Sequence, residues 1–86
     1  MAKGTMRYWA AAKAAAGTAE EPYEARTLAE AIAAAALRNG RGGEFARVVE
    51  RSSFLVDGDP VGTRAHESVV LPDGGVVEVL PPFAGG

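Results

Sequence analysis

Residues 76–86 read Val-Val-Glu-Val-Leu-Pro-Pro-Phe-Ala-Gly-Gly, and this stretch constrains the fold more than any other part of the chain. The five residues from Val76 to Leu80 are nearly all apolar, which is typical of a central strand covered on both faces. Pro81 and Pro82 cannot donate to a strand ladder, so the strand must end before them. The last six residues therefore predict a flexible Gly-Gly tail that leaves directly from a central strand.

One main helix is predicted upstream of this strand. Thr27-Leu-Ala-Glu30 has the pattern of a capping box, in which the Thr27 hydroxyl accepts from a helical amide and Glu30 reaches back. The helix runs over residues 28–39, and Asn39-Gly40 predicts a left-handed stop. Its apolar stripe is typical of a helix that covers one face of a sheet and consists of Leu28, Ala31, Ile32, Ala35 and Ala36.

Strand signals lie on both sides of this helix. A first strand is predicted from Met6, where apolar and polar residues alternate, with residues 1–5 as a loose leader. The alanine-rich stretch that follows is interpreted as a bent strand end and a helical turn stopped by Gly17. Residues 20–25 predict an edge strand, because Pro22 lacks a ladder donor.

The second half of the chain predicts a short helix and two further strand segments before the last strand. Residues 44–51 form the helix, with Phe45, Val48 and Val49 facing inward. Strand character resumes at Phe54-Leu-Val56, and Asp57-Gly58 is a strong signal for a tight turn. We expect residues 62–71 to be irregular, between the return strand at Val61 and the turn at Asp73-Gly74-Gly75.

The predicted order of elements is β–β–α–(short α)–β–β–β, which belongs to the α+β class. A first hairpin, a crossing helix and a late strand beside the first describe the β-grasp (ubiquitin-like) fold, a mixed sheet packed on one main helix. We expect a single domain over residues 1–80, followed by the tail at 81–86.

Composition excludes several classes of function. The 86 residues carry no cysteine and a single histidine, so cysteine nucleophiles, metal clusters and disulfides are not expected. A net charge of −2 argues against a nucleic-acid binder. No apolar stretch is as long as a membrane span requires, and no signal-peptide region is recognised, so the sequence predicts a soluble, cytoplasmic protein. Residues 44–86 hold three Arg against seven Asp and Glu, which favours a basic partner surface.

The C-terminal carboxylate is the best-presented reactive group in this sequence. Pro81-Pro82 projects the tail in an extended conformation, and the terminal glycines allow close approach to a narrow channel. A carboxylate becomes an electrophile when ATP adenylates it, and attack by a persulfide would then leave a thiocarboxylate. The alternative is a frayed tail without function.

These features together resemble the MoaD/ThiS family of ubiquitin-like sulfur carriers, and most of all MoaD, the small subunit of molybdopterin synthase. The resemblance covers about Met6 to Gly86, and its specific part is the Pro-Pro-Phe-Ala-Gly-Gly end. Weaker matches are Arg7-Tyr-Trp-Ala10 with the turn ending at Gly17, Thr27-Leu-Ala-Glu30, Val56-Asp-Gly58 and Leu71-Pro-Asp-Gly74. Family members often have Asp-Gly-Asp-Glu before the last strand, where this chain has Asp73-Gly-Gly-Val76.

The resemblance implies roles for the residues of the tail and of the sheet. Gly86 would carry the adenylate and then the thiocarboxylate, and Gly85 would be its thin neighbour in the channel. Pro81, Pro82, Phe83 and Ala84 would line the approach to the partner's active site. Trp9 and Leu80 would belong to the docking face, and the alternative for both is an ordinary core position.

The resemblance also implies partners. They are a MoeB-like adenylating enzyme that uses ATP, a sulfurtransferase as sulfur donor, and a MoaE-like large subunit of molybdopterin synthase. The domain itself would bind no cofactor or metal and would perform no turnover alone. The alternatives are a sulfur carrier for thiamin thiazole, cysteine, tRNA thiolation or a secondary metabolite, a ubiquitin-like modifier conjugated through Gly86, and an interaction domain with an inert tail.

The tail cannot account for partner binding by itself. Ordering six residues costs roughly 6–12 kcal/mol, with less for the two prolines. Burial of Phe83 returns only about 1.5–3 kcal/mol. The folded body must therefore contribute contacts, and an exposed apolar patch on the sheet is predicted.

Overall fold

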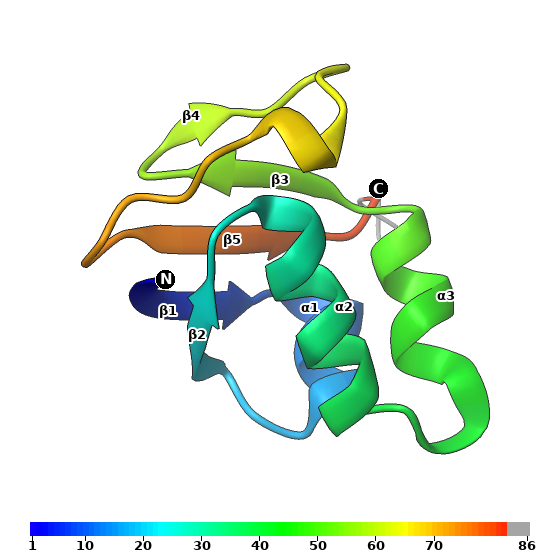
Figure 1. Ribbon diagram of the computed structural model, residues 1–86. Coiled ribbons are helices and arrows are strands. Elements are labelled where there is room, and N and C mark those ends of the chain that lie inside the picture. The colour runs from blue at the N-terminus through cyan, green and yellow to red at the C-terminus, as the bar shows by residue number, and fades with distance from the viewer. Residues whose placement is uncertain (83–86) are drawn as a thin grey trace.

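The computed structural model describes residues 1–82, which form a five-stranded mixed sheet with α-helices packed against it (Figure 1). The order across the sheet is β2-β1-β5-β3-β4, and β5 is parallel to β1 and antiparallel to β3. The strands are β1 (Ala2–Tyr8), β2 (Glu20–Ala25), β3 (Ser53–Val56), β4 (Asp59–Pro60) and β5 (Val76–Leu80). The helices are α1 (Ala10–Ala16), α2 (Leu28–Arg38) and α3 (Glu44–Glu50), with 3-10 turns at Arg41–Gly43 and His66–Ser68. This arrangement confirms the β-grasp fold that the sequence predicts.

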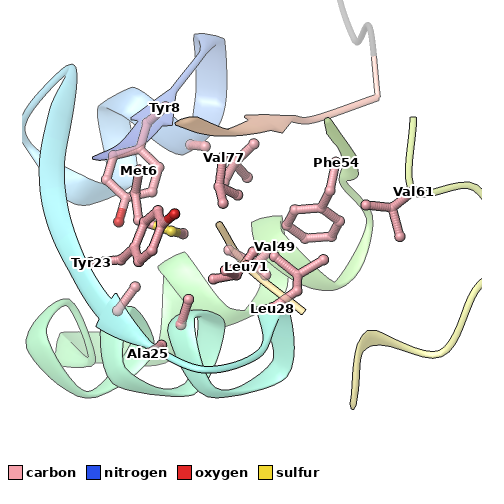
Figure 2. Packing of buried hydrophobic residues seen from close by; sticks show 14 of the residues in the cluster. Met6, Tyr8, Tyr23, Ala25, Leu28, Val49, Phe54, Val61, Leu71 and Val77 are labelled. Carbon is pink, nitrogen blue, oxygen red and sulfur yellow. The ribbon is translucent and has the colours of Figure 1, made fainter. Parts of the chain in front are cut away.

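The hydrophobic core lies between the sheet and the helices. Alternate residues of β1 and β5, among them Tyr8 and Val77, point toward Leu28 of α2 and Val49 of α3 (Figure 2). The rings of Tyr8 and Phe45 meet edge to face, with centroids 5.4 Å apart, a favourable arrangement for an aromatic pair. The side chains of β1 that face the helices are all buried or half-buried. The helices therefore cover this face of the sheet.

The central strand β5 differs from the prediction in one respect. We expected a strand covered on both faces, but only Val77 and Val79 are buried, while Val76, Glu78 and Leu80 are half-buried. The prediction was wrong because β5 is central only in the order of the strands. The helices cover one face of the sheet, and the other face of β5 is left open.

The N-terminal segment also differs from the prediction. Of the residues expected as a loose leader, 2–5 belong to β1, which begins at Ala2 and pairs with β2 as far as Ala25. The main-chain N–H of Lys3 donates to the Asp73 carboxylate at 2.9 Å, so the turn before β5 holds this segment. Residues 10–16 form a complete helix that ends at Gly17 (φ 76°), where the sequence predicted a single turn.

The capping box of α2 is confirmed in its main feature. The Thr27 hydroxyl accepts from the Glu30 N–H at 3.2 Å, and the Glu30 carboxylate accepts from the N–H of Arg26 at 2.9 Å. The predicted left-handed stop is wrong, since Asn39 has φ −113° and Gly40 has φ −78°. The Asn39 side chain ends the helix instead, because its Nδ2 donates to the carbonyl of Ala35 at 2.9 Å.

A polar cluster joins the edge strand β2 to the end of α2. The Glu21 carboxylate accepts from the Tyr8 hydroxyl, from Arg38 Nε at 3.1 Å and from Asn39 Nδ2 at 3.0 Å. Burial alone would raise the pKa of Glu21, but these three donors and the charge of Arg38 together lower it. Burial, and then the bond to Glu21, raise the pKa of Tyr8, so its hydroxyl remains a donor.

This cluster predicts a dependence of stability on acid. The lowered pKa of Glu21 contributes stability that is present above the ordinary Glu pKa of about 4.3 and is lost as pH falls below it. The Glu21→Gln variant should lose about 1–3 kcal/mol of unfolding free energy at pH 7 and much less at pH 3. Urea unfolding at both pH values tests this. Glu24→Gln, at an exposed carboxylate of β2, is the control, and equal acid sensitivity of Glu21→Gln and wild type would contradict the prediction.

Candidate functional site: the root of the tail and the open sheet face

The tail begins at the end of the central strand. The ladder between β5 and β3 ends with Leu80 opposite Ser53, and Pro81 and Pro82 follow directly. Figure 1 places this end of β5 beside the end of α3 and the start of β3. The predicted stop at the two prolines is therefore where the strand ends. The predicted roles of Phe83, Ala84, Gly85 and Gly86 lie outside the described residues.

A groove of about 270 Å³ lies beside these prolines, and we call it the tail-root groove. Its walls come from α1, α3 and the segment after β5: Ala11, Glu44, Arg47, Val48, Arg51, Pro81 and Pro82. Pro82 and both arginines are exposed, while Pro81 and Val48 are half-buried. The groove therefore combines apolar walls with charged rims, at the place where the tail leaves the domain.

The face of the sheet that the helices do not cover, called here the open face, carries Trp9 at the end of β1. The Trp9 side chain is 45% exposed, so the alternative of an ordinary core position is excluded for this residue. The main-chain N–H of Trp9 donates to the carbonyl of Val79 at 3.2 Å, and its indole Nε1 donates to the Glu78 carboxylate at 3.0 Å. These two bonds orient the ring beside β5. Ala10 follows with φ 48°, which turns the chain into α1 immediately after the tryptophan.

Leu80 lies on the same side of β5 as Glu78, because alternate residues of a strand point to the same face. Leu55 of β3 pairs with Glu78, and Pro60 of β4 pairs with Leu55, so apolar residues continue across the open face. Leu80 and Leu55 are half-buried without a helix above them. The structure thus brings Trp9, Leu80, Pro81 and Pro82 together at one end of the sheet; their roles in partner binding remain a prediction.

Sequence reasoning missed two features of this region. Glu78 holds the indole of Trp9, and Arg7 of β1 pairs with Glu20 at 3.5 Å, so charged residues accompany the apolar ones on the open face. The second feature is the position of Arg47 and Arg51 in the tail-root groove, since neither is among the predicted site residues. Their spacing of four residues places them on one side of α3, but only the fold shows that Pro81 and Pro82 lie there as well.

Within residues 1–82 the structure shows no group of three or more His, Asp or Glu side chains that could hold a metal ion. His66 instead packs its ring edge to face against Phe54, with centroids 5.0 Å apart. Over the same residues, none of the helices has both the length and the apolar composition that crossing a bilayer requires.

The sequence model of the ThiS family matches residues 6–86, which is nearly the whole chain and includes the tail. The chain belongs to the ThiS family. This family of ubiquitin-like proteins comprises sulfur carriers and modifiers, and it implies partner enzymes of sulfur transfer. The family resemblance expected from the sequence is confirmed, whereas a comparison with curated proteins gives no match.

Solved structures of three archaeal proteins are similar to this ThiS family member. Small archaeal modifier protein 1 from Methanosarcina acetivorans is 21% identical, with a TM-score of 0.79 over 100% of this chain and 98% of that chain. Its counterpart from Haloferax volcanii is 17% identical, with a TM-score of 0.78 over 98% and 99%. A Pyrococcus furiosus protein, provisionally assigned as molybdopterin converting factor subunit 1, is 26% identical, with a TM-score of 0.76 over 96% and 100%. The two modifier proteins show the fold alone.

Proposed function

We propose that this protein is a sulfur carrier whose C-terminal Gly86 is adenylated and then converted to a thiocarboxylate. The observation that carries the proposal is the exit of the chain: a central strand ends at Pro81-Pro82, and the family match continues through the Gly-Gly end. Neither proline can extend the strand ladder, so the chain leaves the sheet directly after Leu80. The Gly86 carboxylate can thus reach a partner's active site while the domain stays folded.

Each step of this chemistry requires groups that only the partners supply. A carboxylate oxygen of Gly86 attacks the α-phosphorus of ATP, and pyrophosphate leaves. The terminal sulfur of a persulfide on the sulfur donor then attacks the acyl carbon, and AMP leaves. A second thiol of the donor reduces the resulting acyl disulfide, which yields the thiocarboxylate and a disulfide on the donor. The chain has no cysteine, so no thiol of its own can capture the activated tail before the sulfur donor does.

For the acceptor we propose molybdopterin formation, with this chain as the small subunit of a molybdopterin synthase-type complex. The two thiocarboxylate sulfurs needed for a dithiolene would be delivered by two loaded copies, one sulfur each. In this complex a MoaE-like large subunit receives the tail, and a MoeB-like enzyme and a sulfurtransferase reload it. The similarity to the Pyrococcus furiosus protein supports this choice. Sulfur carriage for thiamin thiazole, cysteine, tRNA thiolation or a secondary metabolite uses the same loaded tail.

Conjugation to other proteins is the second candidate function. The two modifier proteins among the similar structures favour it, since their fold matches this chain at TM-scores of 0.79 and 0.78. In this case a lysine amine of a target attacks the Gly86 adenylate, AMP leaves and an isopeptide bond forms. The chain has two lysines of its own, Lys3 and Lys13, both exposed, so few sites are available for self-linked chains.

Intact-mass spectrometry tests the sulfur carrier proposal. The protein is incubated with ATP, a MoeB-like adenylating enzyme and a persulfide-bearing sulfurtransferase, and we expect one oxygen to be replaced by sulfur. Fragmentation of the loaded protein should locate the sulfur on Gly86. A chain that forms the adenylate but never gains sulfur, and is recovered in cells on target lysines, would overturn sulfur carriage in favour of conjugation.

The open face predicts a separate effect on docking. In the Leu80→Asp variant a charge replaces an apolar side chain beside Trp9, and we expect the affinity for the large subunit to fall at least about tenfold. Leu37→Asp is the matched control, because Leu37 is 85% exposed and lies on α2, which covers the opposite face of the sheet. Calorimetric titration measures both. Equal affinities of the two variants would show that the open face is not used.

A further inference from the structure

Two arginines line the tail-root groove, and neither belongs to an ion pair among residues 1–82. Arg47 lies on α3 and Arg51 is the residue that caps its C-terminal end, four positions later, and both are exposed. The ion pairs among residues 1–82 are Lys3–Glu24, Arg7–Glu20 and Arg38–Glu21, so neither groove arginine belongs to one. Arg47 Nη1 donates to the carbonyl of Gly42 at 3.3 Å, which leaves most of its guanidinium donors directed to solvent.

The positive charge of the two arginines is confined to the groove. Residues 44–86 are acidic overall, yet two of their three arginines line one groove, against the single carboxylate of Glu44. Other acidic residues lie outside its lining: Glu50 of α3 lines a different groove beside Phe54, Asp57 belongs to the turn between β3 and β4, Asp73 to the turn before β5, and Glu78 is bonded to Trp9 on the open face. The overall charge thus favours a basic partner, whereas the place where the tail leaves the domain carries a net positive charge.

We propose that the tail-root groove binds an acidic segment of the enzyme that adenylates the tail. A carboxylate of that segment pairs with Arg47 and Arg51, and a neighbouring apolar side chain packs on Val48 and Pro82. The position of the groove identifies this occupant. Pro81 and Pro82 form one of its walls, so an enzyme that encloses the tail must lie over the groove. This inference rests on the proposed activation of Gly86.

The composition of the groove favours a protein segment over a small anion. Anion sites are usually built from backbone N–H groups at helix starts, and the first residue of α3 is itself an acid, Glu44, on the groove wall. The remaining wall residues are apolar: Ala11, Val48, Pro81 and Pro82. Apolar walls between two guanidinium groups suit a carboxylate side chain flanked by hydrocarbon, and they offer a free phosphate no further donors.

Charge reversal tests the proposal. For the Arg47→Glu/Arg51→Glu double variant we expect the KM for the carrier in the adenylation assay to rise at least about tenfold, with kcat nearly unchanged. The affinity of wild type should fall as salt is raised, and the double variant should lose this dependence. Arg26→Glu, at an exposed arginine remote from the groove in sequence and outside its lining, is the matched control. Equal thermal unfolding of all three proteins shows that the reversals leave the fold intact.

The outcomes separate this inference from the proposed function. If the enzyme adenylates wild type and the double variant with the same KM, the groove is not its docking site, although the tail is still its substrate. If wild type is not adenylated at all, the proposed function fails first. A third arm titrates wild type with inorganic phosphate and monitors the arginine side-chain NMR signals. Tight phosphate binding that the double variant loses, with an unchanged KM for the enzyme, would overturn the acidic segment in favour of a small anion.

Discussion

Deletion of Gly86 is expected to abolish sulfur loading while the domain remains folded. The deletion leaves a carboxylate on Gly85, but it withdraws the reacting group by one residue, about 3.5 Å in an extended chain. Reacting atoms must approach within about 3–3.5 Å, so a displacement of this size places the carboxylate out of reach of the α-phosphate. Intact-mass spectrometry after incubation with ATP, the adenylating enzyme and the sulfur donor should show no gain of sulfur.

The Gly86→Ala variant separates reach from width. It keeps the carboxylate at the original length and adds one Cβ, so we expect loading to slow by about tenfold or more and not to vanish. Thermal unfolding should be unchanged in both variants, because the hydrophobic core consists of residues 6–79. A deletion variant that still gains sulfur would place the reactive group elsewhere in the chain and would overturn the proposed function.

The largest expected loss of stability comes from Gly4→Ala in β1. A Cβ at this position would lie 2.4 Å from the carbonyl oxygen of Gly75 and 2.5 Å from the ring carbon Cζ of Tyr23. Neither atom can yield easily, since the Gly75 carbonyl accepts the N–H of Thr5 at 2.9 Å and the Tyr23 hydroxyl donates to Pro72 at 2.6 Å. We expect a loss of about 2–3 kcal/mol or more, which corresponds to roughly 10–20 °C in Tm.

Two further variants test the physical reason for this loss. Lys3→Ala changes the exposed neighbour in the same strand and should shift Tm by no more than a few degrees. In a background where Tyr23→Ala has removed the ring, the cost of Gly4→Ala should be smaller, because one of the two contacts is gone. If Gly4→Ala has no effect on Tm, the close approach of β1 to Tyr23 and Gly75 does not occur in solution.

The same contacts explain a departure from the family pattern. The chain has Gly75 where family members often have Asp, and a Cβ at Gly75 would lie 2.6 Å from Pro72 Cγ and 2.9 Å from the Tyr23 hydroxyl. Gly4 and Gly75 together make room for the ring of Tyr23 under the turn. The sequence alone indicated only a turn at this position, because the space around a glycine depends on side chains far from it in the chain.

Local signals were sufficient for most of the elements. Thr27 and Glu30 predicted the start of α2, Asp57-Gly58 predicted the hairpin, and Pro81-Pro82 predicted the end of β5, because capping, turn and proline effects act within a few residues. The order of these elements was enough for the β-grasp fold. The start of β1 was missed, since Ala2 to Thr5 are held by β2 and by Asp73, which are distant in sequence.

The sequence by itself determined that this is a β-grasp domain with a Gly-Gly tail on its last strand, because strand, helix and stop signals are carried by neighbouring residues. Only the tertiary structure decided what surrounds the tail. It left one face of β5 open, so that Trp9 and Leu80 lie exposed or half-exposed at one end of the sheet. It also placed Arg47 and Arg51 beside Pro81, about thirty positions later in the chain, since packing of α3 at the end of β5 joins residues that no local pattern connects.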